Sequence, residues 1–394
     1  MVHTKTYYIY TFGCQANKSD SERIAGDYQA RGFKPAKTVN QADEIIINSC
    51  AVRQRAEDRV VGLIYNLSQK YKNQEKKFTP RSLGKVGPKI ILTGCMIHHG
   101  EEKLLKMLPF VDEILPIMEV GFNLPTIRRD KKHAWISIST GCNSFCTYCI
   151  VPFSRGREKS RPIKDILKEI DDLVKNGYTQ ITLVGQNVNS YGLEKLGINI
   201  RKLLMHDPKN ITLPTNQSQY KKTTGKPPFV KLLEKICQYD QIKIVRFLTP
   251  NPWDFSDHLI KCIKDHKKID RYIHLPVQSG SNKILKKMNR GYTREDYLSL
   301  IKKLKKSIPD IQLGTDIIVG FPGETKKDFN DTIDLAKKVG FKVAFVAQYS
   351  PRPNTASDKL FKDIIPPKEK KHRWLILERL INKPHLKTRP IVIK

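Results

Sequence analysis

Apolar and polar positions along the first 115 residues alternate between the period of strands and the period of helices. Short apolar runs recur about 40 residues apart, and a segment with helical spacing follows each run. In the first such segment, Ser19 and Glu22 have the spacing of a capping box, and Gly32 is suited to end the helix. This alternation predicts a parallel sheet covered by helices. The predicted strands are 6–12, 44–48 and 89–93, and the two later helices are 53–70 and 101–108.

The same order of strand and helix resumes at residue 134. Residues 134–140 alternate, with Ile136 and Ile138 on one face and Ser137 and Ser139 on the other, which indicates a strand. Consecutive βα units curl into a barrel or part of one, and place their site at the carboxyl ends of the strands. We therefore predict an α/β fold, with an N-terminal parallel-sheet domain followed by a partial (β/α)6 barrel. Its further strands are 181–184, 242–248, 271–274, 311–319 and 342–349, and its helices are 163–174, 230–238, 256–264, 294–305 and 326–338.

The irregular stretches suggest where the domains end. We place the N-terminal domain at residues 1–125 and the barrel at 130–355. Residues 193–228 are polar and basic with scattered glycine and proline, which is typical of a surface insertion. Residues 356–394 form a basic tail with one predicted helix at about 374–380.

Composition narrows the classes of function. The 394 residues carry 71 basic and 39 acidic side chains, a net charge of +32, which favours a polyanionic partner such as nucleic acid. The lysines are spread along the whole chain, so a merely solvated basic surface is the alternative. There is no apolar run of about 20 residues and no apolar stretch at the N-terminus, so we expect no membrane span and no signal peptide. Eight cysteines without a secretion signal fit a reducing cytoplasm.

Three of these cysteines, Cys142, Cys146 and Cys149, lie within eight residues of one another on the loop that leaves the strand 134–140. A structural zinc site needs four ligands, and no fourth cysteine or histidine follows nearby. Short spacings of this kind are typical of iron–sulfur ligands. Three thiolates on a cluster of four irons would leave one iron without a protein ligand.

Three further cysteines, Cys14, Cys50 and Cys95, each follow directly on the carboxyl end of a predicted strand of the first domain. In open parallel sheets that edge is where ligands bind, so the three thiols are expected to converge on a second cluster. The alternative is that they are small buried core residues. The remaining cysteines, Cys237 and Cys262, lie within predicted helices, and we expect them to be structural.

With both triplets present, the chain resembles the methylthiotransferases of the radical S-adenosylmethionine superfamily. The wording of its motifs is more similar to the tRNA enzymes than to the ribosomal-protein enzyme. The motifs run from residue 11 to about 355, and they are TFGCQAN (11–17), NSCAVR (48–53), GCNSFCTYCIVPFSRGRE (141–158), LVGQNVNSY (183–191), HLPVQSGS (274–281), MNRGYT (288–293), TDIIVGFPGE (315–324) and YSPRP (349–353).

The resemblance implies that Cys142, Cys146 and Cys149 hold a 4Fe–4S cluster whose open iron binds S-adenosylmethionine. It implies an auxiliary 4Fe–4S cluster on Cys14, Cys50 and Cys95. One S-adenosylmethionine would donate a methyl group to sulfur, and a second would yield a 5′-deoxyadenosyl radical. That radical would take hydrogen from C2 of N6-(dimethylallyl)adenosine at position 37 of tRNA, giving the 2-methylthio product.

The resemblance also implies partners, namely the tRNA anticodon loop and an electron donor such as flavodoxin or ferredoxin, and we expect a cytoplasmic monomer. We expect no catalytic side chain beyond the cluster ligands, because the cofactors carry such chemistry. Tyr148, Gln186 and Asn187 are candidate contacts to S-adenosylmethionine, with ordinary loop packing as the alternative. Arg155 and Arg157 are candidates for substrate or RNA phosphate contacts, with a surface salt bridge as the alternative.

One feature departs from the family. Its members normally end in a small RNA-binding β-barrel, the TRAM domain, and the tail after residue 353 lacks the Gly-punctuated strands of such a barrel. We expect that module to be absent or truncated. Two alternative functions are a related enzyme acting on threonylcarbamoyladenosine in tRNA or on a ribosomal protein, and a noncatalytic iron–sulfur protein that binds RNA or carries electrons.

Overall fold

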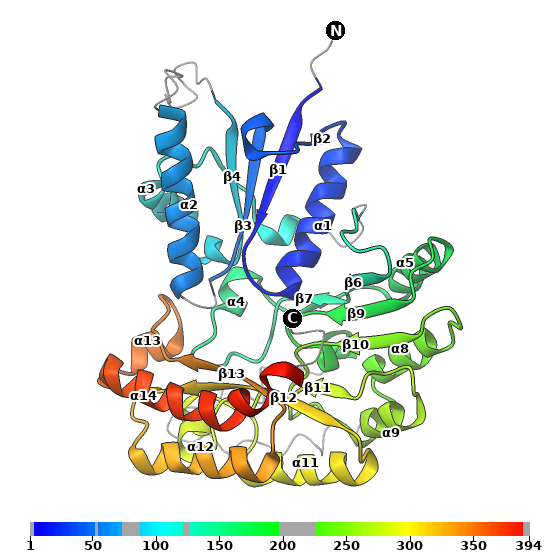
Figure 1. Ribbon diagram of the computed structural model, residues 1–394, viewed down its shortest axis with the longest axis vertical. Coiled ribbons are helices and arrows are strands. Elements are labelled where there is room, and N and C mark those ends of the chain that lie inside the picture. The colour runs from blue at the N-terminus through cyan, green and yellow to red at the C-terminus, as the bar shows by residue number, and fades with distance from the viewer. Residues whose placement is uncertain (1–3, 52–53, 73–86, 121–125, 197–225, 389–394) are drawn as a thin grey trace.

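The computed structural model describes residues 4–51, 54–72, 87–120, 126–196 and 226–388. The chain forms an N-terminal α/β unit and a larger second α/β unit. Figure 1 shows the carboxyl ends of strands β1, β3 and β4 of the first unit pointing toward the second. These strands span Thr6–Thr11, Glu44–Ser49 and Lys89–Gly94.

The sheet of the first unit has five strands in the order β2-β1-β3-β4-β5, all parallel. Its edge strands are the two-residue β2 (Lys34–Pro35) and β5 (Glu113–Ile114), which the sequence analysis did not predict. The central strand β3 is buried along its whole length, as its apolar run requires. Ile45 and Ile47 face one hydrophobic cluster, and Ile46 faces another on the opposite side of the sheet.

Three helices accompany this sheet, namely α1 (Gln15–Ala30), α2 (Gln54–Lys72) and α3 (Glu101–Met107). The predicted capping box at Ser19 is wrong, because α1 begins at Gln15 with Cys14 at its N-cap. Asn17, within the first turn, donates hydrogen bonds from Nδ2 to Asn48 Oδ1 (2.8 Å) and to the Ser49 carbonyl (3.0 Å). These hydrogen bonds hold the first turn of α1 against the carboxyl end of β3.

Over its described residues, the second unit contains six parallel strands, which confirms the predicted partial barrel. They form two three-stranded sheets, β10-β9-β6 and β11-β12-β13, connected by a parallel bridge between Val245 and Ile269. A two-stranded antiparallel sheet of β7 (Ser139–Thr140) and β8 (Lys159–Ser160) flanks the first cysteine of the 142–149 loop. The six strands are β6 (His133–Ser137), β9 (Gln180–Val184), β10 (Ile244–Phe247), β11 (Tyr272–His274), β12 (Gln312–Val319) and β13 (Val343–Gln348).

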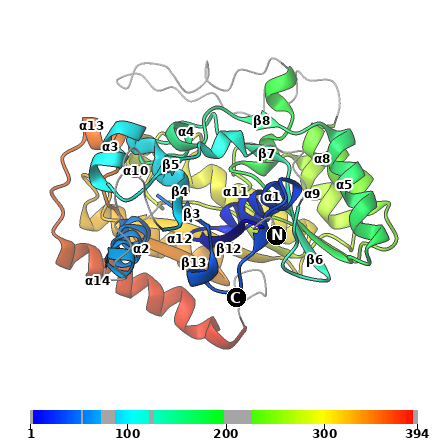
Figure 2. The ribbon, with the colours of Figure 1, turned by 90° about the horizontal axis from the view of Figure 1, so that it is seen from above.

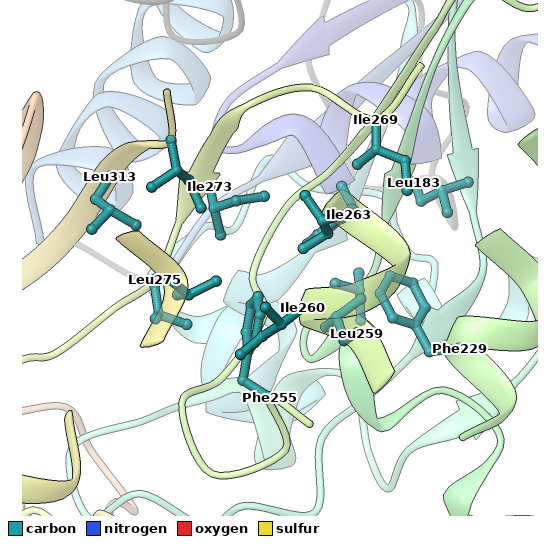
Figure 3. Packing of buried hydrophobic residues seen from close by; sticks show 14 of the residues in the cluster. Leu183, Phe229, Phe255, Leu259, Ile260, Ile263, Ile269, Ile273, Leu275 and Leu313 are labelled. Atoms are coloured by element: carbon teal, nitrogen blue, oxygen red, sulfur yellow. The ribbon is translucent and has the colours of Figure 1, made fainter. Parts of the chain in front are cut away.

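Amphipathic helices cover the outside of these strands, and their apolar faces form the main core. Figure 3 shows Leu259, Ile260 and Ile263 of one helix, α9, packed among side chains from neighbouring strands and helices. Each such fully buried side chain contributes about 1.5–3 kcal/mol of hydrophobic free energy. Figure 2 shows α5 and α8 on one side of the molecule and α14 on the other. The helices are α4 (Val151–Ser154), α5 (Ile163–Lys175), α8 (Pro228–Cys237), α9 (Asp257–Asp265), α10 (Asn282–Lys287), α11 (Arg294–Ser307), α12 (Lys326–Val339), α13 (Ala356–Leu360) and α14 (Pro367–Leu377).

The C-terminal tail is helical over most of its described residues. Helix α14 begins at Pro367, seven residues before the predicted start, and a π-helical turn (Glu378–Asn382) continues it. Proline at the first helical position, Pro367, favours this start, and the Arg373 guanidinium pairs with the buried Glu324 carboxylate at 2.6 Å and holds the helix against the barrel. The structure shows no barrel strand in residues 356–388. Most of the predicted insertion at 193–228 lies outside the described residues.

In the described part of the chain, every helix is too short or too polar to cross a bilayer.

Candidate metal centre

The carboxyl ends of β1, β3 and β4 bring the segments of Cys14, Cys50 and Cys95 together. Gly13 and Gly94, which precede two of these cysteines, have φ angles of 121° and 93°. A Cβ on Gly94 would lie 2.2 Å from the Ser49 carbonyl oxygen, and one on Gly13 would lie 2.8 Å from the Cys50 Cβ. Only glycine permits this close approach, so both outer segments press against the central one.

Arg155 connects this edge to the second unit. It follows α4, and its Nε donates to Cys95 Sγ at 3.4 Å, while its Nη2 donates to Asp20 Oδ2 at 2.7 Å. Its charge also interacts with the Cys14 thiol. The side chain is only 4% exposed, so the predicted contact with RNA phosphates and the alternative of a surface salt bridge are both wrong for Arg155, whereas its predicted contact with the substrate stays a prediction. Its neighbour Arg157 is exposed and stays a candidate for such contacts.

The loop Cys142–Cys149 reaches the same region from the other side. Ile150, directly after Cys149, packs against Cys95 and Ala51 in a small buried cluster. Because Ile150 directly follows Cys149 and contacts Cys95, the segments that carry the two triplets meet at one junction.

Backbone contacts hold the Cys142–Cys149 loop in an unusual conformation. Phe145 has a φ angle of 46°, which is rare for an aromatic residue. Asn289, which also has positive φ, donates from Nδ2 to the Phe145 carbonyl at 3.1 Å. The Thr147 amide donates to the Met288 carbonyl at 3.1 Å. The segment after α10 therefore sets the shape of the cysteine loop.

A second buried arginine donates a hydrogen bond to a cysteine of this loop, as Arg155 does to Cys95 of the first triplet. Arg290 Nη1 donates to Cys146 Sγ at 3.2 Å and to the Tyr148 hydroxyl at 3.4 Å. Its guanidinium carbon also lies 4.7 Å from the centre of the Trp253 ring. Hydrogen bonds from a charged donor stabilise a thiolate, so each triplet has a built-in partner for a metal-bound sulfur.

The pKa values of Cys142 and Cys149 are too high for these thiols to act as free nucleophiles at neutral pH. Burial and the nearby Glu158 carboxylate raise the pKa of Cys142 to about 12. Burial, together with charge on Cys146 and Cys142, raises the pKa of Cys149 well above its usual range. Such thiols stay protonated at neutral pH until a metal displaces the protons. Two sets of three thiols, each with an arginine donor, fit 4Fe–4S clusters.

The candidate contacts to S-adenosylmethionine lie in different surroundings. Gln186 Oε1 accepts from the Gly141 amide at 2.7 Å, directly beside the loop, and Tyr148 lies within it. Asn187 is buried in a polar network and accepts a hydrogen bond from Asn251. The structure thus brings Gln186 and Tyr148 to the cysteine loop, and all three assignments stay predictions.

Two residues that sequence reasoning missed are Arg290 and Glu158. Neither carboxylate oxygen of Glu158 has a hydrogen-bond partner within the described residues, although both are buried. Burial, with Glu194 and Asp254 nearby, raises its pKa well above the usual range for a carboxyl group. Both residues belong to motifs quoted above, 288–293 and 141–158, but only the folded chain shows what their side chains face.

A three-thiol loop at the strand ends of a partial barrel defines a radical S-adenosylmethionine enzyme. Residues 136–336 match the family model described as "Radical SAM superfamily", and residues 6–116 match "Uncharacterized protein family UPF0004". A relative from Thermotoga petrophila, named tRNA-2-methylthio-N(6)-dimethylallyladenosine synthase, is 40% identical over 389 residues, which cover 95% of this chain and 81% of the relative. A relative of the same name from Thermoanaerobacter pseudethanolicus is 42% identical and is covered to 72%, over 89% of this chain.

The chain belongs to the methylthiotransferase family of radical S-adenosylmethionine enzymes. Its cofactors are S-adenosylmethionine and 4Fe–4S clusters.

Solved structures agree on the fold. The radical S-adenosylmethionine methyltransferase TsrM from Kitasatospora setae superposes with a TM-score of 0.54 at 12% identity, covering 90% of this chain and 75% of TsrM. The cobalamin-dependent radical enzyme OxsB superposes with a TM-score of 0.51 at 12% identity, covering 94% of this chain and 56% of OxsB. At such identities the similarity concerns the fold alone.

Proposed function

We propose that this protein converts N6-(dimethylallyl)adenosine at position 37 of tRNA into its 2-methylthio derivative, using two 4Fe–4S clusters. The observation that carries the proposal is the contact between Cys95 of the first triplet and the segment that directly follows the second triplet. Cys95 packs against Ile150, and Arg155, six residues after Cys149, donates to its sulfur. Two clusters held there would face one junction, as transfer of sulfur to a single carbon requires. The curated relatives carry the name of this reaction.

The side chains of the protein act by placement rather than by acid–base chemistry. When bound, the clusters and S-adenosylmethionine supply the electron, the hydrogen-abstracting radical, the methyl group and the sulfur. Cys142, Cys146 and Cys149 hold the cluster that binds S-adenosylmethionine, and Arg290 stabilises its sulfur ligands. Glu158 supplies an unpaired buried carboxyl group beside Cys142, and the cationic sulfonium and ammonium groups of S-adenosylmethionine would favour its ionised form on binding.

The first triplet and its arginine hold the second cluster. Cys14, Cys50 and Cys95 bind it at the edge of the N-terminal sheet. Arg155 donates to Cys95 and is oriented by Asp20, so it fixes this edge against the second unit. The packing of Ile150 on Cys95 excludes water from part of the junction.

The net charge of +32 supports RNA as the substrate-bearing partner, because basic side chains neutralise phosphates. A base of the anticodon loop can be splayed out of its stack and enter a protein site. The proposal includes cytoplasmic function, a monomeric enzyme, and reduction by a small electron carrier such as flavodoxin or ferredoxin.

The first experiment counts clusters. The wild-type protein is reconstituted anaerobically, and iron and sulfide are measured. We expect about eight irons in the wild type and about four in the Cys14→Ala/Cys50→Ala/Cys95→Ala variant, since each cubane holds four. Cys237→Ala/Cys262→Ala is the matched control, because these two buried thiols belong to helices α8 and α9, and it should keep the full iron content. Equal iron in the triple variant and the wild type would contradict the two-cluster assignment.

The second experiment identifies the substrate. The reconstituted enzyme, S-adenosylmethionine and a reductant are incubated with tRNA carrying either N6-(dimethylallyl)adenosine or N6-threonylcarbamoyladenosine, and the nucleosides are analysed by mass spectrometry. We expect the methylthio product from the first tRNA only. Product from the second tRNA alone would assign the enzyme to the other nucleoside. Cluster binding without 5′-deoxyadenosine formation on either tRNA would favour a noncatalytic protein.

A further inference from the structure

A buried group of potential metal ligands lies beside the first cysteine triplet but is separate from its thiols. Within the described residues, Glu57, His98 and His99 are the one set of three such side chains whose ligand atoms all lie within 4.8 Å of one another. Glu57 Oε1 is 3.5 Å from His99 Nε2 and 4.0 Å from His98 Nε2. The side chains are 6%, 0% and 7% exposed, for Glu57, His98 and His99 in turn.

Four buried nitrogen and oxygen atoms of this group form no hydrogen bond with the described residues. Glu57 Oε1, His98 Nε2 and both ring nitrogens of His99 are buried and have no partner among the described residues. The two imidazole rings lie with their centres only 4.0 Å apart. Leaving several buried polar atoms unpaired costs about 1–3 kcal/mol each, so the arrangement calls for a ligand that satisfies them together.

The hydrogen bonding of His98 fixes which nitrogen is available. Its Nδ1 lies 2.9 Å from the Cys95 carbonyl oxygen, which can only accept, so Nδ1 carries the proton. In the neutral ring the lone pair is then on Nε2, the atom that faces Glu57. A histidine that donates one N–H to a carbonyl and presents its other nitrogen is typical of metal sites.

A neighbouring arginine orients the carboxylate of this group. Arg352, from the segment after β13, donates from Nη1 to Glu57 Oε2 at 3.3 Å. This contact orients the carboxylate and leaves Oε1 directed at the histidines. Because Arg352 occupies Oε2, Oε1 and the unpartnered ring nitrogens are the atoms left to bind a cation with high affinity for nitrogen.

We propose that Glu57, His98 and His99 bind one divalent transition-metal ion of the zinc type, in addition to the iron–sulfur clusters. Two histidines and one carboxylate are a common zinc ligand set with an open fourth position. Ligand atoms about 2.1 Å from a tetrahedral ion lie about 3.4 Å apart, so the observed 3.5 and 4.0 Å exceed this spacing by about 0.1 and 0.6 Å, and all three ligand atoms lie within 4.8 Å of one another. The inference goes beyond the proposed function and does not depend on it.

The position of the site indicates a structural role. Glu57 belongs to α2, His98 and His99 to the turn that begins at Cys95, and Arg352 to the second unit. An ion there would tie the Cys95 turn to α2 and, through Glu57, to the segment after β13.

The test measures zinc on the reconstituted protein with its clusters in place. Wild type, His99→Gln and the control His372→Gln are incubated with zinc, dialysed at a fixed low free-zinc concentration, and analysed for zinc and iron. His99 is chosen because its ring forms no hydrogen bond, so its loss disturbs the fold least. His372 is an exposed histidine on α14. We expect one zinc in the wild type and the control, a zinc affinity at least roughly 100-fold weaker in His99→Gln, and unchanged iron in all three.

X-ray absorption at the zinc edge gives the second readout. We expect nitrogen and oxygen ligands only. Sulfur ligands would place the zinc on the cysteines and overturn the proposal, as would equal zinc retention by His99→Gln and wild type. Zinc should also raise the thermal midpoint of the wild type and the control but not of His99→Gln, and an equal rise in all three would again contradict the site.

Discussion

The contact between the two units can be weakened at one side chain, Arg155. Its guanidinium is buried, pairs with Asp20 at 2.7 Å, and donates to Cys95 at 3.4 Å. Replacing it by glutamine keeps much of the volume and removes the charge. The change therefore isolates the ion pair and the sulfur hydrogen bond from the packing around α4.

The expected loss of unfolding free energy depends on how well the Asp20 carboxylate remains paired. Removing one partner of a buried ion pair typically costs about 3–5 kcal/mol, because the other charge is stranded. Here Asp20 keeps a second partner, since Arg23 Nη2 lies 2.6 Å from its other oxygen. We therefore expect a destabilisation near or just below the lower end of that range, about 2–3 kcal/mol.

The assay is urea unfolding of the cluster-free, reduced protein at pH 7, with free energies compared at one common urea concentration. Lys106→Gln is the control, because it breaks an ion pair with Glu102 whose side chains are 74% and 84% exposed. Such exposed pairs contribute about 0–1 kcal/mol. If Arg155→Gln cost no more than Lys106→Gln, the reasoning that this buried pair fixes the junction would be refuted.

Two further predictions concern charge. Glu158→Gln should weaken S-adenosylmethionine binding to the reconstituted enzyme roughly tenfold or more, because glutamine cannot ionise beside the bound sulfonium and ammonium groups, and equal affinity by equilibrium dialysis would contradict this role. Burial, and then Arg246, lower the pKa of His133 from 6.5 to about 4, so the folded state binds fewer protons than the unfolded state between these values. The stability of cluster-free protein should therefore fall as the pH drops from 6.5 toward 4, by about 1 kcal/mol from this ring after allowing for solvent screening. His133→Gln should lose that part of the slope, and an unchanged slope in pH-dependent urea unfolding would count against it.

Much of the architecture could be read from periodicity. The strand predicted at 44–48 is the buried centre of its sheet, and the strands and helices predicted between residues 163 and 349 agree with the structure to within a few residues. This worked because long, strongly patterned segments each bury one face. The edge strands β2 and β5 were missed because two paired residues leave no pattern.

Helix boundaries were less accessible from the sequence. The helix predicted from the Ser19 capping box starts instead at Gln15, because the side chain of Asn17 bonds the neighbouring strand end. The last helix starts at Pro367, and proline at the first helical position is a local signal that the prediction overlooked. Only the start of the first helix depends on a tertiary contact that no local signal contains.

The sequence by itself determined the chemistry that this protein can hold, because thiols at the ends of strands and in a short loop are covalent features of the chain. It also determined the order of strands and helices, since that order follows from local hydrophobic spacing. Only the tertiary structure decided which side chains meet. Arginine is a residue type that often contacts phosphates, yet Arg155 is buried against Asp20 and Cys95. Glu57, His98 and His99 converge although about 40 residues separate the first from the other two. Such encounters depend on how two units pack, and the free energy of that packing comes from residues far apart in the sequence.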